Sequence, residues 1–200
     1  MDSETLKAAP RELRTRRLLL QAPRPDHAPA LLDSINTSFH TLGFINFGQS
    51  AWDQARAERH LSEGLAMVER GEYLVYFAFR LDNGAYVGRI DLHSFDFDTP
   101  RGEVGYVGDV RQAGQGLMRE AVLAVMGLGF ELGLQRIQAL SESANARALQ
   151  FAQAVGFRQE GVLRHFERDA QGQLGEQVMF AMLPTEWAAA VAASTQGPPR

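Results

Sequence analysis

Residues 111–120 read Arg-Gln-Ala-Gly-Gln-Gly-Leu-Met-Arg-Glu and join an expected strand, Glu103–Val110, to an expected helix that begins at Leu117. Gly114 and Gly116 let the backbone turn tightly and approach a ligand closely, because neither carries a Cβ atom. A glycine-rich turn that leads into a helix directs several free N–H groups at one point, where the helix dipole adds partial positive charge. The stretch therefore favours a phosphate or diphosphate site over an ordinary strand-to-helix turn.

Two common phosphate loops do not fit this stretch. A nucleotide P-loop requires glycine, four residues and then Gly-Lys-Ser/Thr, but Lys7 is the only lysine of the sequence. A dinucleotide-binding fingerprint requires a third glycine three positions after Gly116, where Arg119 stands. Both of these nucleotide sites are therefore excluded.

The composition of the whole chain narrows the class of protein further. Two hundred residues, 45% hydrophobic and 22% charged, suit one globular domain with a single core. A net charge of −4 argues against a nucleic-acid partner and leaves room for a cationic substrate. The chain has no cysteine, and its five histidines lack metal-ligand spacing, so no metal site is expected. No apolar run suits a signal peptide or a membrane span, and the expected compartment is the cytoplasm.

Apolar periodicity and turn residues predict a mixed α/β domain over residues 11–188, after a flexible leader (1–10) and before a disordered tail (189–200). The expected helices are Asp26–Ser38, a helix capped by Ser50 that runs to Arg70, Leu117–Leu132, Asn145–Val155 and Pro184–Ala193. The expected strands are Leu13–Gln21, Tyr73–Leu81, Tyr86–Ser94, Glu103–Val110, Arg136–Ser141, Phe157–Arg168 and Gln173–Leu183. Turns are expected at Asp82-Asn83-Gly84 and Asp169–Gly172, and a loop is expected at Thr41–Gln49.

Several motifs in this order resemble the GNAT acetyltransferase superfamily. Arg111-x-x-Gly114-x-Gly116 matches its Arg/Gln-x-x-Gly-x-Gly/Ala signature, and Gly102–Val107 resembles the strand before it. Asn145–Ala148 and Val155-Gly156-Phe157 resemble its Asn-x-x-Ser…Gly-Phe segment. Glu160-Gly161 and Glu186-Trp187 are similar to the RimJ/RimL branch, which acetylates protein N-termini.

The resemblance implies one domain with a mostly antiparallel sheet, whose fourth and fifth strands (Glu103–Val110 and Arg136–Ser141) splay apart. It also implies acetyl-CoA as cofactor, with the pantetheine arm of coenzyme A lying along the fourth strand like an added strand. Arg119 and Arg147 are candidates to reach phosphate oxygens. The implied cofactor-binding residues are Val107, Asp109, Val110, Arg111, Gly114, Gln115, Gly116, Leu117, Met118, Asn145 and Arg147.

Two positions depart from the family pattern. Ala148 stands where the motif has serine, which in RimL-like enzymes is thought to protonate the departing thiolate. Ala154 stands where a lysine that contacts the nucleotide end is usual. Backbone groups do most of the cofactor binding, so the departures affect the general acid more than the binding.

The implied reaction is direct attack of an amine on the thioester of acetyl-CoA, assisted by a general base. Glu167 occupies the position of the RimL-like base, where His165 shares its strand face, and Glu103 occupies the position that serves in other branches. Tyr106 and Ser141 are candidate acids. Unassisted release of the thiolate is the alternative, since a thiol has a pKa of ~8.5.

The sequence is compatible with three hypotheses for the acceptor of the acetyl group. The first is the α-amine of a peptide or protein, and the second is a small amine such as a polyamine, an amino acid or an aminoglycoside. The third is no acceptor at all, in an acyl-CoA-binding module without turnover, which Ala148 keeps open. Residues 39–52, with Asp96 and Asp98, are expected to shape the acceptor pocket, and a homodimer is compatible with the sequence.

Overall fold

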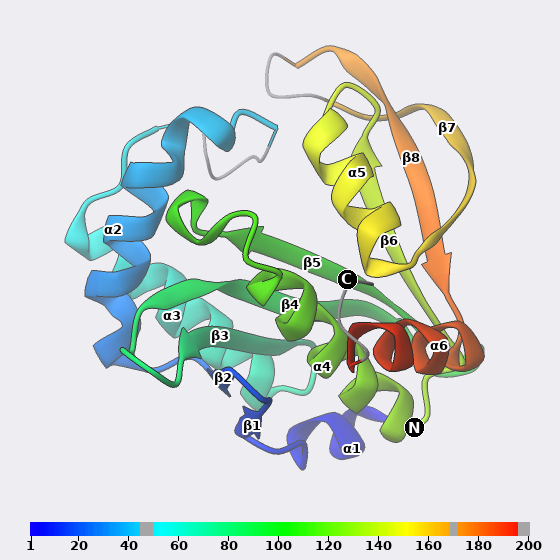
Figure 1. Cartoon of the computed structure of the whole chain (residues 1–200), viewed down its shortest axis with the longest axis horizontal. Helices are drawn as coiled ribbons and strands as arrows, with labels where there is room; N and C mark the ends of the chain where they lie inside the picture. Colours follow the sequence, from blue (N-terminus) through cyan, green and yellow to red (C-terminus); the bar gives the residue numbers. More distant parts are fainter. Residues whose placement is uncertain (45–49, 169–171, 196–200) are drawn as a thin grey trace.

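The structure, a computed structural model, describes residues 1–44, 50–168 and 172–195. In these residues the strands form one sheet in the order β1-β2-β3-β4-β5-β6-β8-β7 (Figure 1). Every neighbouring pair is antiparallel except β5–β6, which confirms the expected mixed α/β fold with a mostly antiparallel sheet. The strands are β1 (Glu12–Arg14), β2 (Leu18–Gln21), β3 (Leu74–Arg80), β4 (Tyr86–Asp96), β5 (Arg101–Gly108), β6 (Arg136–Glu142), β7 (Arg158–Arg168) and β8 (Leu174–Met182).

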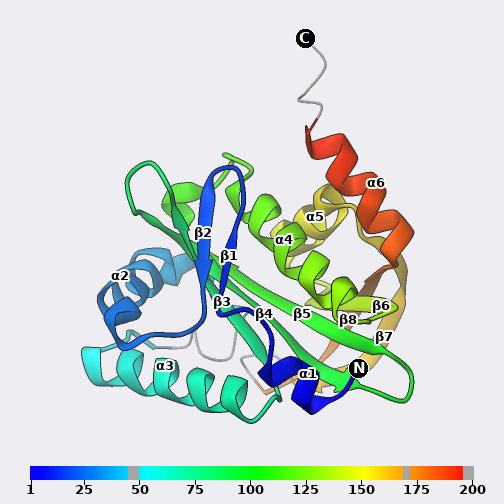
Figure 2. The ribbon, with the colours of Figure 1, turned by 90° about the horizontal axis from the view of Figure 1, so that it is seen from below.

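Helices cover both faces of the sheet, as Figure 2 shows. They are α1 (Ser3–Lys7), α2 (Ala28–Ser38), α3 (Gln54–Glu69), α4 (Leu117–Glu131), α5 (Ala146–Val155) and α6 (Pro184–Thr195). In β3, Val75 and Phe77 join the core under α2 and α3, whereas Leu74, Tyr76 and Ala78 join the core under α4. Both faces of β3 are therefore buried, which explains its continuous apolar run. None of the described helices has the length and apolar composition needed to cross a bilayer.

The two strands at the centre of the sheet part soon after they pair. β5 and β6 are in register only from Arg101↔Arg136 to Glu103↔Gln138. Beyond that point β5 stays with β4 as far as Gly108, and β6 stays with β8 as far as Glu142. The expected splay of the strands is therefore present, and it leaves one edge of β5 open beyond Glu103.

The first expected strand is wrong as a single element. Leu13–Gln21 is instead a hairpin of β1 and β2, which pair antiparallel around a turn at residues 15–17. Thr15 N donates to the Leu18 carbonyl oxygen at 2.9 Å, and Thr15 Oγ1 accepts from Leu18 N at 3.0 Å. A threonine side chain that bonds to nearby backbone favours a turn over a straight strand.

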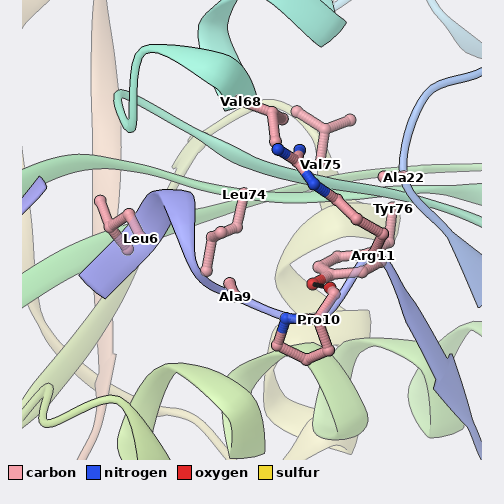
Figure 3. A pocket seen from close by; sticks show the side chains of 9 residues that line it. All are labelled: Leu6, Ala9, Pro10, Arg11, Ala22, Val68, Leu74, Val75 and Tyr76. Carbon is pink, nitrogen blue, oxygen red and sulfur yellow. Dashed lines mark hydrogen bonds between the residues drawn. The ribbon is translucent and has the colours of Figure 1, made fainter. Parts of the chain in front are cut away.

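The expected leader is partly structured. Residues 3–7 form α1, and Leu6 is buried in the core. Tyr76 Oη donates to the Pro10 carbonyl oxygen, and Figure 3 shows Leu6, Ala9, Pro10 and Arg11 together with Val68, Leu74 and Tyr76 around a shallow pocket. Apolar contacts therefore hold these first residues against β3 and α3.

Other boundaries shift by a few residues. Asp53, not Ser50, caps α3, and its carboxylate accepts from Arg56 N at 2.7 Å. The helix expected to end at Ala193 continues to Thr195, so part of the expected tail is helical. Residues 45–49 of the expected loop, 169–171 of the expected turn and 196–200 of the tail lie outside the described residues.

We expect Gly88→Ala to destabilise the fold, because its Cβ would overlap Met118 Sδ and the Val107 carbonyl oxygen. Overpacking of this kind costs about 1–3 kcal/mol, measured as a lower denaturant midpoint at constant m-value. Gly161→Ala is the matched control, because a Cβ there meets no atom within 4 Å. Equal midpoints for the two variants would contradict the close seating of α4 on β4 and β5.

Candidate active site

The glycine loop folds as a tight turn between β5 and α4. Gly114 and Gly116 have φ values of 76° and 70°, in the left-handed region that glycine adopts without strain. A Cβ on Gly114 would meet no protein atom within 4 Å, so backbone conformation and not packing requires glycine there. Gly116 is also the N-cap residue of α4.

Several backbone N–H groups of this loop have no hydrogen-bond acceptor in the described residues. No described residue accepts a hydrogen bond from the backbone N–H groups of residues 114–118. Leu117 and Met118 lie in the first helical turn, whose N–H groups have no partner within the helix. The loop residues 113–116 are exposed, whereas Leu117 is buried at the start of the helix. Together with the dipole of α4, these donors make an arrangement that suits an anion.

The side chain of Arg111 ties this loop to helix α2 and to the end of β5. Its guanidinium is 2.6 Å from Asp109 Oδ2 and 2.7 Å from Asp33 Oδ2. Burial alone would raise the pKa of Asp109, but hydrogen bonds from Arg111 and Ser34 outweigh it and lower the pKa below its usual value. The backbone N–H of Arg111 also donates to Asp109 Oδ1, at 2.8 Å, so both its side chain and its N–H group have partners and Arg111 holds the loop in place.

The open edge of β5 consists of alternate residues. Asp109 N donates to the Val87 carbonyl oxygen at 2.9 Å, and two residues back Val107 faces Arg89 in the same ladder. Because alternate residues of an antiparallel strand bond to the same neighbour, the main chains of Tyr106 and Gly108 point away from β4. They line the open edge, whereas the N–H groups of Asp109 and Val110 are taken. Val110 N donates to Ser38 Oγ at 3.0 Å.

The side chain of Tyr106 reaches the other side of the splay. Its ring lies 4.9 Å from that of Phe151 on α5, measured between centroids. Its hydroxyl is buried and has no hydrogen-bond partner in the described residues. Burial raises the pKa of Tyr106 to about 12, so the hydroxyl keeps its proton and can donate it to a ligand.

Helix α5 brings Asn145 and Arg147 to the far side of the splay. Asn145 caps the helix, and its Oδ1 accepts from Ala148 N at 3.1 Å. The amide Nδ2 and the exposed Arg147 side chain have no partner in the described residues and are available to a ligand. Arg119 is committed elsewhere, since it donates to the carbonyl oxygens of Ala154 (2.8 Å) and Ala190 (3.2 Å).

Glu103 lies at the vertex where β5 and β6 part. It is half-buried, and Gln138 Nε2 is 3.4 Å from its Oε2. His93 is its partner across the β4–β5 ladder. Glu103 is therefore placed at the inner end of the open edge, on the face that α2 and α3 cover.

A row of polar residues on β4, Arg89, Asp91 and His93, continues from this vertex, and the sequence alone did not point to it. Asp91 is only 4% exposed and lies over Gly105, which has no Cβ to displace it. Arg89 Nη1 is 2.8 Å from Asp91 Oδ1 without hydrogen-bond geometry, and His93 Nε2 is 3.6 Å from Oδ2. Polar residues at every second position of an apolar strand, Arg89-x-Asp91-x-His93, were the available signal.

Glu167 and His165 lie apart from this vertex, near the end of β7. Both side chains are exposed. The register of β7 against β8 shifts between Leu163 and Glu167, and His165 has a positive φ of 52°. The bulge breaks the strand alternation from which a shared face was inferred.

A small cavity of about 10 Å³ lies beside β5 on the face covered by α2 and α3. Its lining is Leu31, Ser34, Ile35, Trp52, His60, Tyr86, Arg89 and Val107. Burial lowers the pKa of His60 to about 4, and the charges of Arg89 and Arg56 act in the same direction. His60 is therefore neutral near pH 7, and the cavity keeps an aromatic and apolar character.

We expect His60 to make the protein less stable as the pH falls from 6.5 towards 4. In that window the unfolded chain binds a proton that the folded protein excludes, and above 6.5 the effect vanishes. The loss is on the order of 2 kcal/mol after allowance for partial exposure, measured as the free energy of unfolding at pH 7 and pH 4.5. His60→Leu should lose less stability over this range; parallel losses would rule out the buried neutral state.

Three comparisons with known proteins bear on this geometry. In a search of curated proteins, an uncharacterized N-acetyltransferase p20 of Bacillus licheniformis is 33% identical over 103 residues. The match covers 51% of this chain and 57% of that protein, little more than half of either.

Among solved structures, RimL, a ribosomal L7/L12 alpha-N-protein acetyltransferase in complex with coenzyme A, is similar with a TM-score of 0.76 and 21% identity. The structural match covers 84% of this chain and 95% of the RimL chain. The microcin C7 self-immunity acetyltransferase MccE, in complex with acetyl-CoA and AMP, gives a TM-score of 0.77 and 16% identity, over 84% and 93% of the two chains.

A family model provides the direct assignment. The acetyltransferase (GNAT) domain matches residues 17–158, which include β2, the glycine loop, Asn145 and Gly156. With the splayed strands and the loop already described, we conclude that this chain belongs to the GNAT acetyltransferase domain family.

Proposed function

We propose that this chain transfers the acetyl group of acetyl-CoA to a primary amine, in particular the α-amine of a peptide or protein. The observation that carries the proposal is the open edge of β5 at Tyr106 and Gly108. It is followed in the chain by residues 114–118, whose backbone N–H groups have no acceptor in the described residues. An extended amide chain that ends in a diphosphate, as in coenzyme A, matches this sequence of donors and acceptors. RimL and MccE, which have this fold, were crystallised with coenzyme A and acetyl-CoA.

The chain's own groups suit each part of the cofactor. The loop N–H groups and the dipole of α4 would bind the diphosphate. The main chains of Tyr106 and Gly108 would pair with the pantetheine amides, and Asn145 Nδ2 and Arg147 would contact the arm and its phosphates from α5. The bound cofactor supplies an activated acetyl thioester, and the protein positions it.

Glu103 is the favoured general base. It is half-buried at the inner end of the open edge, where the arm of a cofactor held by the loop would end, and Asp91 and His93 lie beside it. Its carboxylate would take the amine proton directly or through one water. Glu167 stays the alternative base, although its side chain is exposed beyond the bulge of β7.

Tyr106 is the favoured donor to the reacting centre. Its buried hydroxyl has no other partner, and its raised pKa keeps it protonated while charge develops on the thioester oxygen or on the departing sulfur. A positioned donor of this kind is worth several kcal/mol in a site without water. It would replace the serine hydroxyl that Ala148 lacks.

The basicity of the acceptor favours an α-amine. With a pKa of ~8, roughly a tenth of an α-amine is neutral at pH 7, whereas a lysine amine with a pKa of ~10.4 is neutral to only ~0.04%. A site with one half-buried carboxylate as base suits the less basic group. RimL, which is an alpha-N-acetyltransferase of a ribosomal protein, supports the same acceptor class.

The test is thiol release from acetyl-CoA with peptides, their N-terminally blocked counterparts and a panel of small amines. We expect turnover with free peptides, none with blocked ones and a dependence on the first two residues. Faster turnover of a small amine would contradict the peptide proposal, and cofactor binding without any turnover would favour the non-catalytic interpretation.

In the same assay Glu103→Gln should lower kcat by about 10²–10⁴-fold, and Glu167→Gln should lower it much less.

Tyr106→Phe separates a chemical role of the tyrosine hydroxyl from a structural one. Tyr106→Phe keeps the ring contact with Phe151 but removes the hydroxyl, so kcat should fall by about 10²-fold or more. Because the hydroxyl is buried without a partner, its removal should leave the melting temperature unchanged or higher. A lower melting temperature with unchanged kcat would assign Tyr106 a purely structural role.

A further inference from the structure

Arg17, in the turn between β1 and β2, lies directly against the glycine loop. Its Nη1 donates to the Gln115 carbonyl oxygen at 2.9 Å. Its Nη2 would lie 3.6 Å from a Cβ placed on Gly116. The side chain therefore flanks the N-terminus of α4, although the two segments are about a hundred residues apart in the chain.

Helix α4 holds Arg17 in this position through Glu120. Arg17 Nε donates to Glu120 Oε2 at 2.6 Å, and Arg17 N and Thr15 Oγ1 donate to Oε1 at 2.9 Å and 2.6 Å. Burial raises the pKa of Glu120, but these hydrogen bonds outweigh burial and lower it, so the carboxylate is charged. A guanidinium fixed at Nε and Nη1 has a defined plane and little freedom to turn.

The fixed guanidinium keeps donors to spare. Of its five N–H groups, one on Nε and one on Nη1 are used, and both on Nη2 lack an acceptor in the described residues. The Arg17 side chain is 37% exposed, so the Nη2 side is open. Nη2 lies beside Gly116, where the backbone N–H groups of the loop also lack an acceptor in the described residues.

The other arginines around the loop are committed. Arg111 pairs with Asp33 and Asp109, and Arg119 donates to two carbonyl oxygens. Arg80 pairs with Asp82 and donates to Gln115 Oε1 at 2.9 Å. Among these arginines, Arg17 therefore has free N–H donors that lie beside the unpaired backbone N–H groups of the loop.

We propose that Arg17 is a cofactor-binding residue whose Nη2 donates to an oxygen of the coenzyme A diphosphate held by the loop, with Thr15 and Glu120 as its positioning residues. This inference rests on the proposed function, which supplies the ligand. The turn between β1 and β2 then forms one wall of the diphosphate site. Arg17 also offsets the charge of Glu120, which lies in the first turn of α4 close to the bound phosphates.

The test is the dissociation constant of coenzyme A by calorimetry for the wild type and Arg17→Gln. Loss of a charge-assisted hydrogen bond should weaken binding about 10- to 100-fold. Arg16→Gln is the matched control, because it removes the same charge from an exposed neighbour without a partner in the described residues, and it should bind within about twofold of wild type. An Arg17→Gln affinity equal to that of Arg16→Gln overturns the proposal.

Dephospho-coenzyme A, which lacks the ribose 3′-phosphate, identifies the phosphate involved. We expect Arg17→Gln to weaken both ligands by the same factor. A loss confined to coenzyme A would place Arg17 at the 3′-phosphate and overturn the diphosphate assignment.

The double variant Arg17→Gln/Glu120→Gln separates contact from charge neutralisation. If Arg17 touches the diphosphate, the double variant stays weak; full recovery of wild-type affinity would mean that Arg17 only neutralises Glu120, which also overturns the proposal.

Arg17→Lys and a thermal melt of every variant guard against misfolding. Lysine keeps the charge but cannot bond to Glu120, Gln115 and a phosphate in one plane, so it should bind coenzyme A less tightly than wild type at an unchanged melting temperature. Wild-type affinity for Arg17→Lys would contradict the bonding role. Failure of the wild type itself to bind coenzyme A would refute the proposed function, whereas normal binding by both Arg17 variants would refute this inference alone.

Discussion

Strand β5 keeps its ladder with β4 along its length but pairs with β6 over only three residue pairs. That constraint shapes the rest of the molecule. Because β6 remains bonded to β8, the sheet stays continuous at the vertex and opens beyond it. The main chains at Tyr106 and Gly108 are left without strand partners, which is costly unless a ligand or water satisfies them. The same parting brings Glu103 to the vertex and Tyr106 to the wall formed by α5.

The glycine loop supplies the donors of the site, and side chains from other elements hold it. Arg111 connects the loop to α2 through Asp33, and Arg17 connects the first hairpin to α4 through Glu120. Ion pairs at a surface contribute little to stability by themselves. Here their effect is geometric, because they fix the loop relative to three elements before any ligand arrives. A loop whose N–H groups are already aimed pays less on binding an anion.

Two buried polar groups near the vertex lack a hydrogen bond, which lowers the stability of the fold locally. Asp91 is buried with an oxygen that lacks a hydrogen bond, and Tyr106 carries a buried hydroxyl without a partner. A buried hydroxyl without a partner, such as that of Tyr106, costs roughly 1–3 kcal/mol in a folded protein, whereas the ion pair with Arg89 offsets part of the cost at Asp91. Unsatisfied groups around one vertex are what a site built for a polar ligand would retain, since stability and function compete at such positions.

The sequence by itself determined the fold class, most element boundaries to within a few residues, the glycine loop and the family motifs. These follow from local physics: left-handed turns demand glycine at 114 and 116, and apolar periodicity marks the covered faces. The hairpin at Thr15–Arg17 was missed because one side-chain bond, not hydrophobic pattern, turns the chain there.

Only the tertiary structure decided which side chains share the site. Arg119 looked available and caps the end of α5 instead, whereas Arg17 looked like part of a strand and lies on the loop. In the sequence Glu167 was slightly preferred to Glu103 as the base; the structure places Glu103 where β5 and β6 part and Glu167 near the bulge of β7. Charge and residue type are local properties, but the partner of each charge depends on how segments distant in the chain pack together.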